Sequence, residues 1–238
     1  IERDQEYHSK IFNVKEKKLE KEISYPIYSV DSQSKFALSF NFSRLSENRK
    51  GYGYDMLSDR FDNQPSTSTD GIWKINLSTG ERRLIVSIED IANLEKESSM
   101  ESANHWINHV FISPDDTRFV FLHRWTTNDG WKTRLLVCDC DGNDLTVLQK
   151  EGHPSHMAWK SDNELLSTVV FKEPSKPRCS YILYNISAGK KQNVYTNLST
   201  DGHPSYAPDG RLVTDTKPNH LGEREILVGA ENRINKIG

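Results

Sequence analysis

The stretch His109-Val-Phe-Ile-Ser-Pro-Asp-Asp-Thr-Arg-Phe-Val-Phe-Leu122 decides the fold, because its pattern occurs twice more at one fixed spacing. When the three segments are aligned on the aspartate of their central turn, successive aspartates are 47 residues apart. The aspartates are Asp115, Asp162 and Asp209, and the histidines six residues before them are His109, His156 and His203. An internal period of about 20–50 residues is typical of solenoids, propellers and arrays.

Outside these segments the chain carries pairs of short apolar runs that flank tight turns, most of them containing glycine. Such a pattern predicts β-hairpins. The pairs are Ser9–Val14 with Lys18–Ile23, Ile72–Leu77 with Arg82–Val86, Leu135–Cys140 with Leu145–Leu148, and Ile182–Ile186 with Gln192–Tyr195. A degenerate copy of the histidine segment begins at Tyr25, with Asp31 in the position of Asp115. Each repeat therefore supplies four antiparallel strands, which is the blade of a β-propeller.

We therefore predict an all-β fold, a β-propeller of four-stranded antiparallel blades that occupies residues 1–238 as a single domain. The expected parts are a half blade at 1–23 and blades at 25–87, 109–149, 156–195 and 203–238. Propellers close on about four to eight blades. About four and a half blades that start and end in mid-blade favour a fragment of a six- or seven-bladed propeller. The alternative is that the half blade pairs with terminal strands at Glu225–Val228 and Ile234–Gly238 and closes a small ring.

Two segments depart from the period. Residues 43–70 are rich in Asn, Asp, Ser, Gly and Tyr, so we expect an insertion that forms a long loop. Residues 87–104 contain Ile88, Ile91, Ala92 and Leu94 among acidic residues, and this spacing indicates a short helical segment between blades.

The composition excludes several classes of protein. The 238 residues are 35% hydrophobic and 10% aromatic, which argues against disorder. The net charge is −3 with both signs interspersed, so no basic surface favours nucleic acid. No apolar run is long enough to span a membrane. The sequence starts without a basic segment followed by an apolar one, so no signal peptide is visible in it. We expect a cytoplasmic protein, or a periplasmic one if a signal peptide has been removed.

The three cysteines are too few, and odd in number, for a disulfide framework. Cys138 and Cys140 stand two apart in a predicted strand and so face the same side. We interpret them as half-buried strand residues in preference to a metal or redox pair.

The repeated histidines indicate a site at one end of a channel. The first strand of a propeller blade lines the central channel, so His109, His156 and His203 should lie at one mouth of it. The second strand returns to that mouth, where it places His123, Arg124 and Asp215.

A cluster of neutral imidazoles suits a divalent transition metal such as Mn, Fe, Ni or Zn. We therefore predict His109, His156 and His203 as metal ligands. The alternative is that each histidine is a structural residue of the repeat that hydrogen-bonds a neighbouring blade. Five tryptophans occur in the chain, and inter-blade packing explains them best. Trp106 and Trp125 flank the expected mouth and are candidates to stack on a pyranose.

Several segments resemble the group of propellers that includes the oligogalacturonate lyases and TolB-like propellers. These segments read Asn108-His-Val-Phe-Ile-Ser-Pro-Asp, Leu122-His-Arg-Trp125, Ser155-His-Met-Ala-Trp159, Asp201-Gly-His-Pro-Ser-Tyr-Ala-Pro-Asp-Gly and Val213-Thr-Asp-Thr216. The resemblance covers roughly Asn108–Asn219, about half of the chain. Its Ser-Pro-Asp-Gly elements are shared by many propellers, and the ordered histidines are more specific to this group.

The resemblance implies a seven-bladed propeller that binds Mn²⁺ and splits short uronides by β-elimination. His156 and His203 match the ligand positions of that family, His109 or His123 falls near its catalytic base, and Arg124 falls near the substrate carboxylate. Asn108 and Asp215 lie in the matching segments and are assigned to substrate binding with Trp106 and Trp125.

Two functions follow as expectations. The first is a metal-dependent, polysaccharide-lyase-like propeller that cleaves short acidic (uronate) oligosaccharides by β-elimination. In this reaction a histidine takes the proton beside the carboxylate, and a divalent metal and Arg124 stabilise the negative charge that forms. The alternative is a non-catalytic propeller that scaffolds a protein or glycan partner. The sequence by itself leaves open whether the protein is an enzyme.

Overall fold

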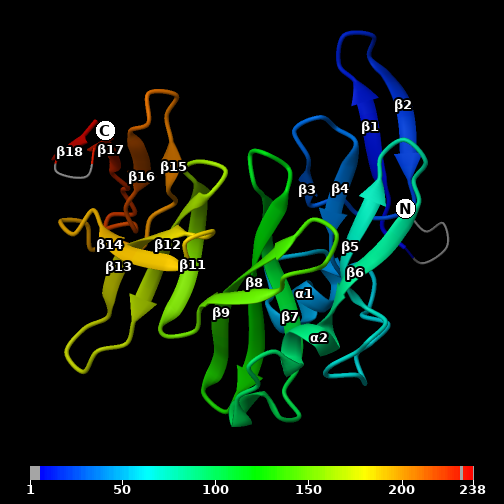
Figure 1. Cartoon of the computed structure of the whole chain (residues 1–238), viewed down its shortest axis with the longest axis horizontal. Helices are drawn as coiled ribbons and strands as arrows, with labels where there is room; N and C mark the ends of the chain where they lie inside the picture. Colours follow the sequence, from blue (N-terminus) through cyan, green and yellow to red (C-terminus); the bar gives the residue numbers. More distant parts are fainter. Residues whose placement is uncertain (1–5, 231–232, 238) are drawn as a thin grey trace. The chain divides into compact units, whose positions relative to one another are not determined.

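The structure is a computed structural model that describes residues 6–230 and 233–237. It is all-β apart from two short α-helices and one 3₁₀ turn in the described ranges, and it contains four four-stranded antiparallel sheets and a separate hairpin (Figure 1). Each four-stranded sheet is built from four strands that pair in chain order. This is the blade of a β-propeller, so the predicted fold class is confirmed.

The first half of the chain forms the hairpin and two blades. The hairpin is β1 (Ser9–Asn13) and β2 (Lys18–Ile23). The first blade is β3 (Ser29–Val30), β4 (Phe36–Ser39), β5 (Gly71–Asn76) and β6 (Arg82–Ser87). The second is β7 (His105–Ile112), β8 (Arg118–Thr127), β9 (Gly130–Asp139) and β10 (Thr146–Gln149).

The second half forms two more blades. One is β11 (His153–Trp159), β12 (Glu164–Phe171), β13 (Arg178–Asn185) and β14 (Lys190–Val194). The other is β15 (Ser205–Tyr206), β16 (Leu212–Asp215), β17 (Ile226–Ala230) and β18 (Arg233–Lys236). Of the predicted half blade 1–23, residues 1–5 lie outside the described part.

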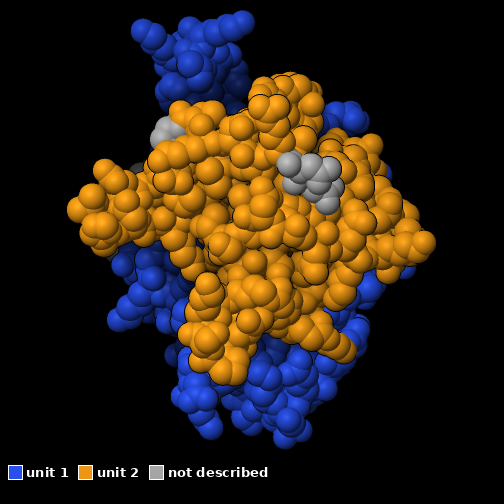
Figure 2. All heavy atoms as spheres, turned by 90° about the vertical axis from the view of Figure 1, so that its left-hand side faces the viewer, with its two compact units in different colours: residues 1–112, 116–132, 136–147 blue, residues 113–115, 133–135, 148–238 orange. Residues whose placement is uncertain are grey.

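The chain divides into two compact units, which Figure 2 shows in different colours. Unit 1 consists of residues 1–112, 116–132 and 136–147, and unit 2 of residues 113–115, 133–135 and 148–238. That the blades make up one domain, with the boundaries given above, stays a prediction.

Unit 1 has its own apolar core. Buried side chains of the first two blades and of both helices meet in one cluster, with Leu38 from β4, Ile72 from β5, Ile107 from β7 and Phe121 from β8 among its members. β8 is buried without interruption from Phe119 to Trp125, so its sheet is covered on both faces. The core of unit 2 includes Leu166, Tyr181, Leu183 and Leu212.

The insertion at residues 43–70 is not a loop throughout, as the sequence had suggested. It begins in α1 (Phe42–Asn48), whose N-cap is Asn41, with the side-chain oxygen accepting the Arg44 N–H at 2.9 Å. An N-cap bond of this kind satisfies one of the free N–H groups of the first turn. Phe42 and Leu45, three residues apart, bury one face of the helix.

The segment 87–104 is helical only in part. α2 (Ile88–Asn93) starts with a capping box in which Ser87 and Asp90 bond each other's backbone N–H groups, and a 3₁₀ turn follows at Ser98–Met100. Within the described ranges, no helix combines the length and the apolar character that a bilayer crossing needs.

Cys138, Cys140 and Cys179 are free thiols and are buried, which is a deeper position than the half-buried one expected for the first two. Burial raises the pKa of each thiol to about 12. At neutral pH the thiols are therefore protonated and poor nucleophiles.

Candidate functional site

Two of the repeated histidines lie side by side in unit 2. His156 is on β11, where the pairing with β12 shifts register between Pro154 and Met157, and His203 comes just before β15. A bulge of this kind turns a side chain out of the regular alternation of the strand. The two imidazole rings have their centroids 4.0 Å apart and are tilted by 41°.

Each imidazole of the pair faces an aspartate through Nδ1. The His156 Nδ1 lies 3.3 Å from Asp201 Oδ1, and the His203 Nδ1 lies 2.9 Å from Asp215 Oδ1. A ring that donates its Nδ1–H to a carboxylate keeps the lone pair on Nε2, which is the arrangement found behind most metal-binding histidines.

The two carboxylates are ionised in the folded protein. Burial by itself would raise the pKa of Asp201, but hydrogen bonds from His156 and Thr168 outweigh it and hold that pKa below its ordinary value. The pKa of Asp215 is likewise lowered. Burial opposes its ionisation, but the backbone and side-chain hydrogen bonds from His203 favour the ionised form more strongly. Both aspartates are therefore acceptors for imidazole N–H groups at neutral pH.

Short hydrogen bonds hold the backbone and the aspartates around the histidine pair in place. The Thr168 Oγ1 accepts the His156 N–H at 3.1 Å and donates to Asp201 at 2.8 Å. Asp215 also accepts the backbone N–H of His203 at 2.7 Å. Gly202 lies so close to β16 that an added Cβ would stand 2.0 Å from the Asp215 carbonyl oxygen. Only glycine lets the chain approach β16 closely enough to set His203 against Asp215.

Two cations complete the surroundings. The Arg224 Nη1 donates to Asp215 Oδ2 at 2.8 Å, and the Lys217 Nζ lies 3.8 Å from Asp201 Oδ2. Both cationic side chains are largely exposed. They are therefore placed to meet an anionic group that approaches the imidazoles.

His109 lies in unit 1, at an irregularity of β7 similar to that of His156. The pairing of β7 with β8 shifts register between Asn108 and Phe111, and His109 has a φ of 55°. Its Nδ1 lies 3.2 Å from the Tyr28 hydroxyl oxygen. Burial raises the pKa of Tyr28, so that hydroxyl stays protonated at neutral pH.

His123 and Arg124 do not follow the second strand of their blade, as the sequence had suggested. β8 continues through both to Thr127, and both side chains are buried. The His123 Nε2 lies 2.9 Å from the His105 Nδ1, and the His105 Nε2 lies 3.1 Å from the Met100 carbonyl oxygen. Because the His105 Nε2–H must donate to that carbonyl, its Nδ1 accepts and the His123 Nε2 carries a proton.

Three of the residues expected to contact a sugar are buried in the same blade as His123 and Arg124. Trp106 and Trp125 are each 1% exposed, and Asn108 is buried beside them on β7. A ligand would have to open the blade to stack on either indole. Asp215 belongs to the histidine pair described above.

Sequence reasoning missed Asp201 and Arg224 as parts of the site. Asp201 stands two residues before His203 and has no counterpart in the other repeats, and Arg224 follows an irregular loop. Within residues 6–230 and 233–237, no group of three or more His, Cys, Asp or Glu side chains is arranged to hold a metal ion. The pair offers two imidazole nitrogens, and water or a ligand would have to supply the other donors.

No protein-family model and no curated protein matches the sequence. Solved structures resemble it in fold. The tricorn protease matches with a TM-score of 0.56 and 11% identity over 94% of this chain and 24% of that one. The β-propeller domain of the Trilobed protease from Pyrococcus furiosus has a TM-score of 0.46 and 14% identity over 70% of this chain and 48% of that one.

TolB from Acinetobacter baumannii matches with a TM-score of 0.36 and 14% identity, over 70% of this chain and 42% of that one. The chain thus spans between about a quarter and a half of the length of these structures. At such low identities the likeness extends to the fold alone. The observed blades and the match to the tricorn protease together identify the chain as a β-propeller.

Proposed function

We propose that unit 2 binds a divalent transition metal through His156 and His203 and acts as a lyase-like centre on short uronate oligosaccharides. The observation that carries the proposal is the pair of adjacent imidazoles, each with its Nδ1 facing its own aspartate. Imidazole nitrogen suits Zn, Cu, Fe and Ni, and Mn enters from the resemblance of the sequence.

The residues around the pair fit such a metal in their chemistry. Asp201 and Asp215 orient the rings and raise the basicity of the two Nε2 atoms. When bound, the metal would act as a Lewis acid toward the substrate carboxylate. Arg224 and Lys217, both exposed, would hold that carboxylate electrostatically.

The reaction removes the proton next to the uronate carboxylate, forms a carbon–carbon double bond and breaks the glycosidic carbon–oxygen bond. A base takes the proton, and the leaving oxygen gains one. His109 and His123 belong to unit 1 and stay predictions, both as catalytic residues and His109 also as a metal ligand. The substrate-binding roles of Arg124, Trp106, Asn108 and Trp125 would require these buried side chains to become accessible.

The test combines metal content with product formation. Protein purified without chelator is analysed for bound metal and incubated with oligogalacturonates while the ultraviolet absorbance of unsaturated uronides is recorded. We expect His156→Ala and His203→Ala to lose metal and activity, and the matched variant His220→Ala, in an exposed turn, to keep both. Metal-free protein that forms no product, or metal retained by both pair variants, would reject the proposal.

A non-catalytic propeller is the second candidate, and a different surface favours it. In unit 1 the Arg49 guanidinium lies 3.9 Å from the centroid of the Tyr52 ring and 5.6 Å from that of Trp131. Both aromatic residues are 41% exposed. Aromatic residues and arginine are enriched where proteins bind partners. Under this proposal Trp131→Ala weakens oligogalacturonate binding, measured by fluorescence titration, and no product forms.

A further inference from the structure

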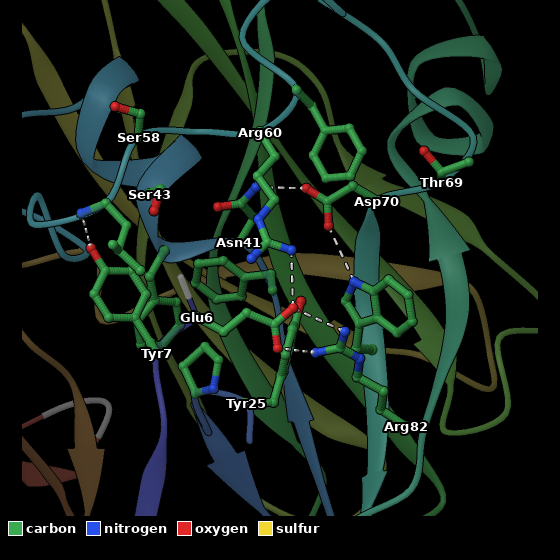
Figure 3. A pocket seen from close by; sticks show the side chains of 16 residues that line it. Glu6, Tyr7, Tyr25, Asn41, Ser43, Ser58, Arg60, Thr69, Asp70 and Arg82 are labelled. Atoms are coloured by element: carbon green, nitrogen blue, oxygen red, sulfur yellow. Dashed lines mark hydrogen bonds and ion pairs between the residues drawn. The ribbon is translucent and has the colours of Figure 1, made fainter. Parts of the chain in front are cut away.

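Unit 1 contains a cavity of about 240 Å³ (Figure 3). Aromatic rings form much of its wall, among them Tyr7, Tyr25, Phe61 and Trp73. An apolar cavity of about 150 Å³ holds a benzene molecule. The space is therefore sufficient for one ring with a polar substituent.

Two arginines converge on one carboxylate at this cavity. Arg82 donates through Nη1 and Nη2 to the two oxygens of Glu6, both at 3.3 Å, and Arg60 donates through Nη1 at 3.1 Å. Figure 3 shows the Glu6 side chain held between the two guanidinium groups. A two-bond contact between arginine and carboxylate is among the stronger and more directional hydrogen-bonded pairs.

Arg82 is also fixed in place by the aromatic wall. Its guanidinium carbon lies 4.5 Å from the centroid of the Tyr25 ring and 5.3 Å from that of Trp73. Rings at this distance attract a cation through their π face. The guanidinium is therefore positioned for an anion before any ligand arrives.

We propose that this cavity binds a small monocarboxylate with a ring-sized apolar body, and that Glu6 occupies the carboxylate position in its absence. The ligand carboxylate would replace that of Glu6 between Arg60 and Arg82, and its body would fill the aromatic space. Concave sites of this kind, mostly apolar with a few convergent polar groups, are typical of small-ligand binding.

The acidic side of the cavity argues for a single carboxylate. Asp70 lines it and is buried, and its oxygens accept bonds from the Trp73 Nε1–H, the Gly71 N–H and the Asn41 Nδ2. A second carboxylate on the ligand would meet Asp70, and like charges in a buried site repel.

Glu6 acts as an internal competitor under this proposal. A site that is free for only part of the time binds its ligand with an affinity reduced by that fraction. Replacing Glu6 by glutamine removes the charge that holds it between the arginines. We therefore expect Glu6→Gln to bind the ligand about tenfold more tightly than the unaltered protein.

The experiment uses 4-fluorobenzoate as the probe and follows its binding to the whole chain by ¹⁹F NMR titration. The neutral analogue 4-fluorobenzamide tests whether the negative charge of the ligand is needed. Acetate, which carries the charge but no ring, is tested for its ability to displace 4-fluorobenzoate, and this shows whether the apolar body is needed. Glu16→Gln, which removes an exposed carboxylate from the β1–β2 hairpin, is the matched control. In the Glu6→Gln background, Arg82→Gln should weaken binding by roughly tenfold to a hundredfold.

The proposal requires that 4-fluorobenzoate bind at least about tenfold more tightly than the amide and acetate, and that Glu6→Gln alone strengthen it. Equal affinity for the benzoate and the amide would overturn it. It would also be overturned if Glu6→Gln bound no more tightly than Glu16→Gln, or if neither the unaltered protein nor Glu6→Gln bound the probe. None of these comparisons depends on the folding of an arginine variant.

Discussion

Arg44 in α1 holds the insertion at residues 43–70 to the rest of unit 1, and its replacement by methionine should destabilise the fold strongly. Its side chain pairs with Asp59 at 3.0 Å, and the two side chains are only 4% and 2% exposed. It also donates to four backbone carbonyl oxygens, those of His105, Phe61, Gln64 and Pro65, at 2.6 to 3.2 Å.

The magnitude follows from this burial. Methionine keeps much of the apolar stem but leaves the Asp59 carboxylate buried without its cation, a loss that costs about 3–5 kcal/mol. For a chain of this length, 1 kcal/mol lowers the melting temperature by about 2–4 °C. We therefore expect Arg44→Met to lower it by roughly 6–20 °C.

The assay is thermal and urea unfolding followed by circular dichroism. Arg83→Met is the matched control, because Arg83 makes an ion pair with Asp141 in which both side chains are 62% exposed, and such pairs contribute about 0–1 kcal/mol. Asp59→Asn should restore part of the stability of Arg44→Met. The Asp59 Oδ1 accepts from Asn41 and from the Phe61 N–H, and asparagine keeps an oxygen there.

The reasoning is refuted if Arg44→Met unfolds at the same temperature as Arg83→Met. It is also refuted if Asp59→Asn adds its full cost to that of Arg44→Met, since two members of one buried pair must couple.

Three further outcomes are expected. Gly142→Ala should lower the stability of the fold by more than Gly80→Ala. Both glycines have a positive φ, and alanine in that conformation costs about 1 kcal/mol at either position. Only at Gly142 would the new Cβ also overlap a neighbour, because it would stand 2.1 Å from the Ile85 carbonyl oxygen. Burial by itself would raise the pKa of Asp139, but the hydrogen bonds from Asn143 and Asp141 together outweigh it and lower that pKa. The stabilisation by Asp139 is therefore present above its unfolded pKa of about 3.9 and is lost as the pH falls through the folded value. In urea unfolding, Asp139→Asn should therefore cost under about 1 kcal/mol at pH 7, and this cost should shrink as the pH falls below the unfolded pKa. A cost that does not change with pH would contradict this. The three thiols, Cys138, Cys140 and Cys179, should resist iodoacetamide in the folded protein at pH 7.5, because burial raises the pKa of each to about 12. They should react once the protein is unfolded in urea. If the folded protein is labelled as fast as free cysteine, the thiols are accessible and the prediction is wrong.

The blades could be predicted from the sequence because their determinants are local. The period of 47 residues and the glycine-bearing turns are determined by neighbouring residues and need no knowledge of the tertiary fold. The helix α1 escaped notice because its stability depends on bonds from Arg44 to residues as far away as His105. The continuation of β8 through His123 and Arg124 depends likewise on its place between β7 and β9.

Of the candidate site, the sequence predicted the two histidines and Asp215, but not that Asp201 and Asp215 hydrogen-bond the imidazoles. The repeat singles out His156 and His203, whereas the partners of their Nδ1 atoms, Asp201 and Asp215, follow no repeat of their own. Hydrogen bonding between side chains of separate segments is a tertiary property, and a single sequence does not encode it in any spacing.

The aspartates provide an independent check on the metal site. Loss of an outer carboxylate typically weakens a histidine-bound metal by about 10- to 100-fold. Asp201→Asn should therefore lower the affinity of the site for the metal without unfolding unit 2. An unchanged metal affinity would show that Asp201 does not support His156 as a ligand.

The most direct test of the central claim is a titration of the whole chain with Mn²⁺, followed through the imidazole resonances in ¹H–¹⁵N NMR spectra. Our account expects selective broadening of the His156 and His203 signals at low metal concentrations, with the buried His105 and His123 pair and the exposed His220 unaffected. Equal broadening of all exposed histidines, or none at His156 and His203, would contradict it.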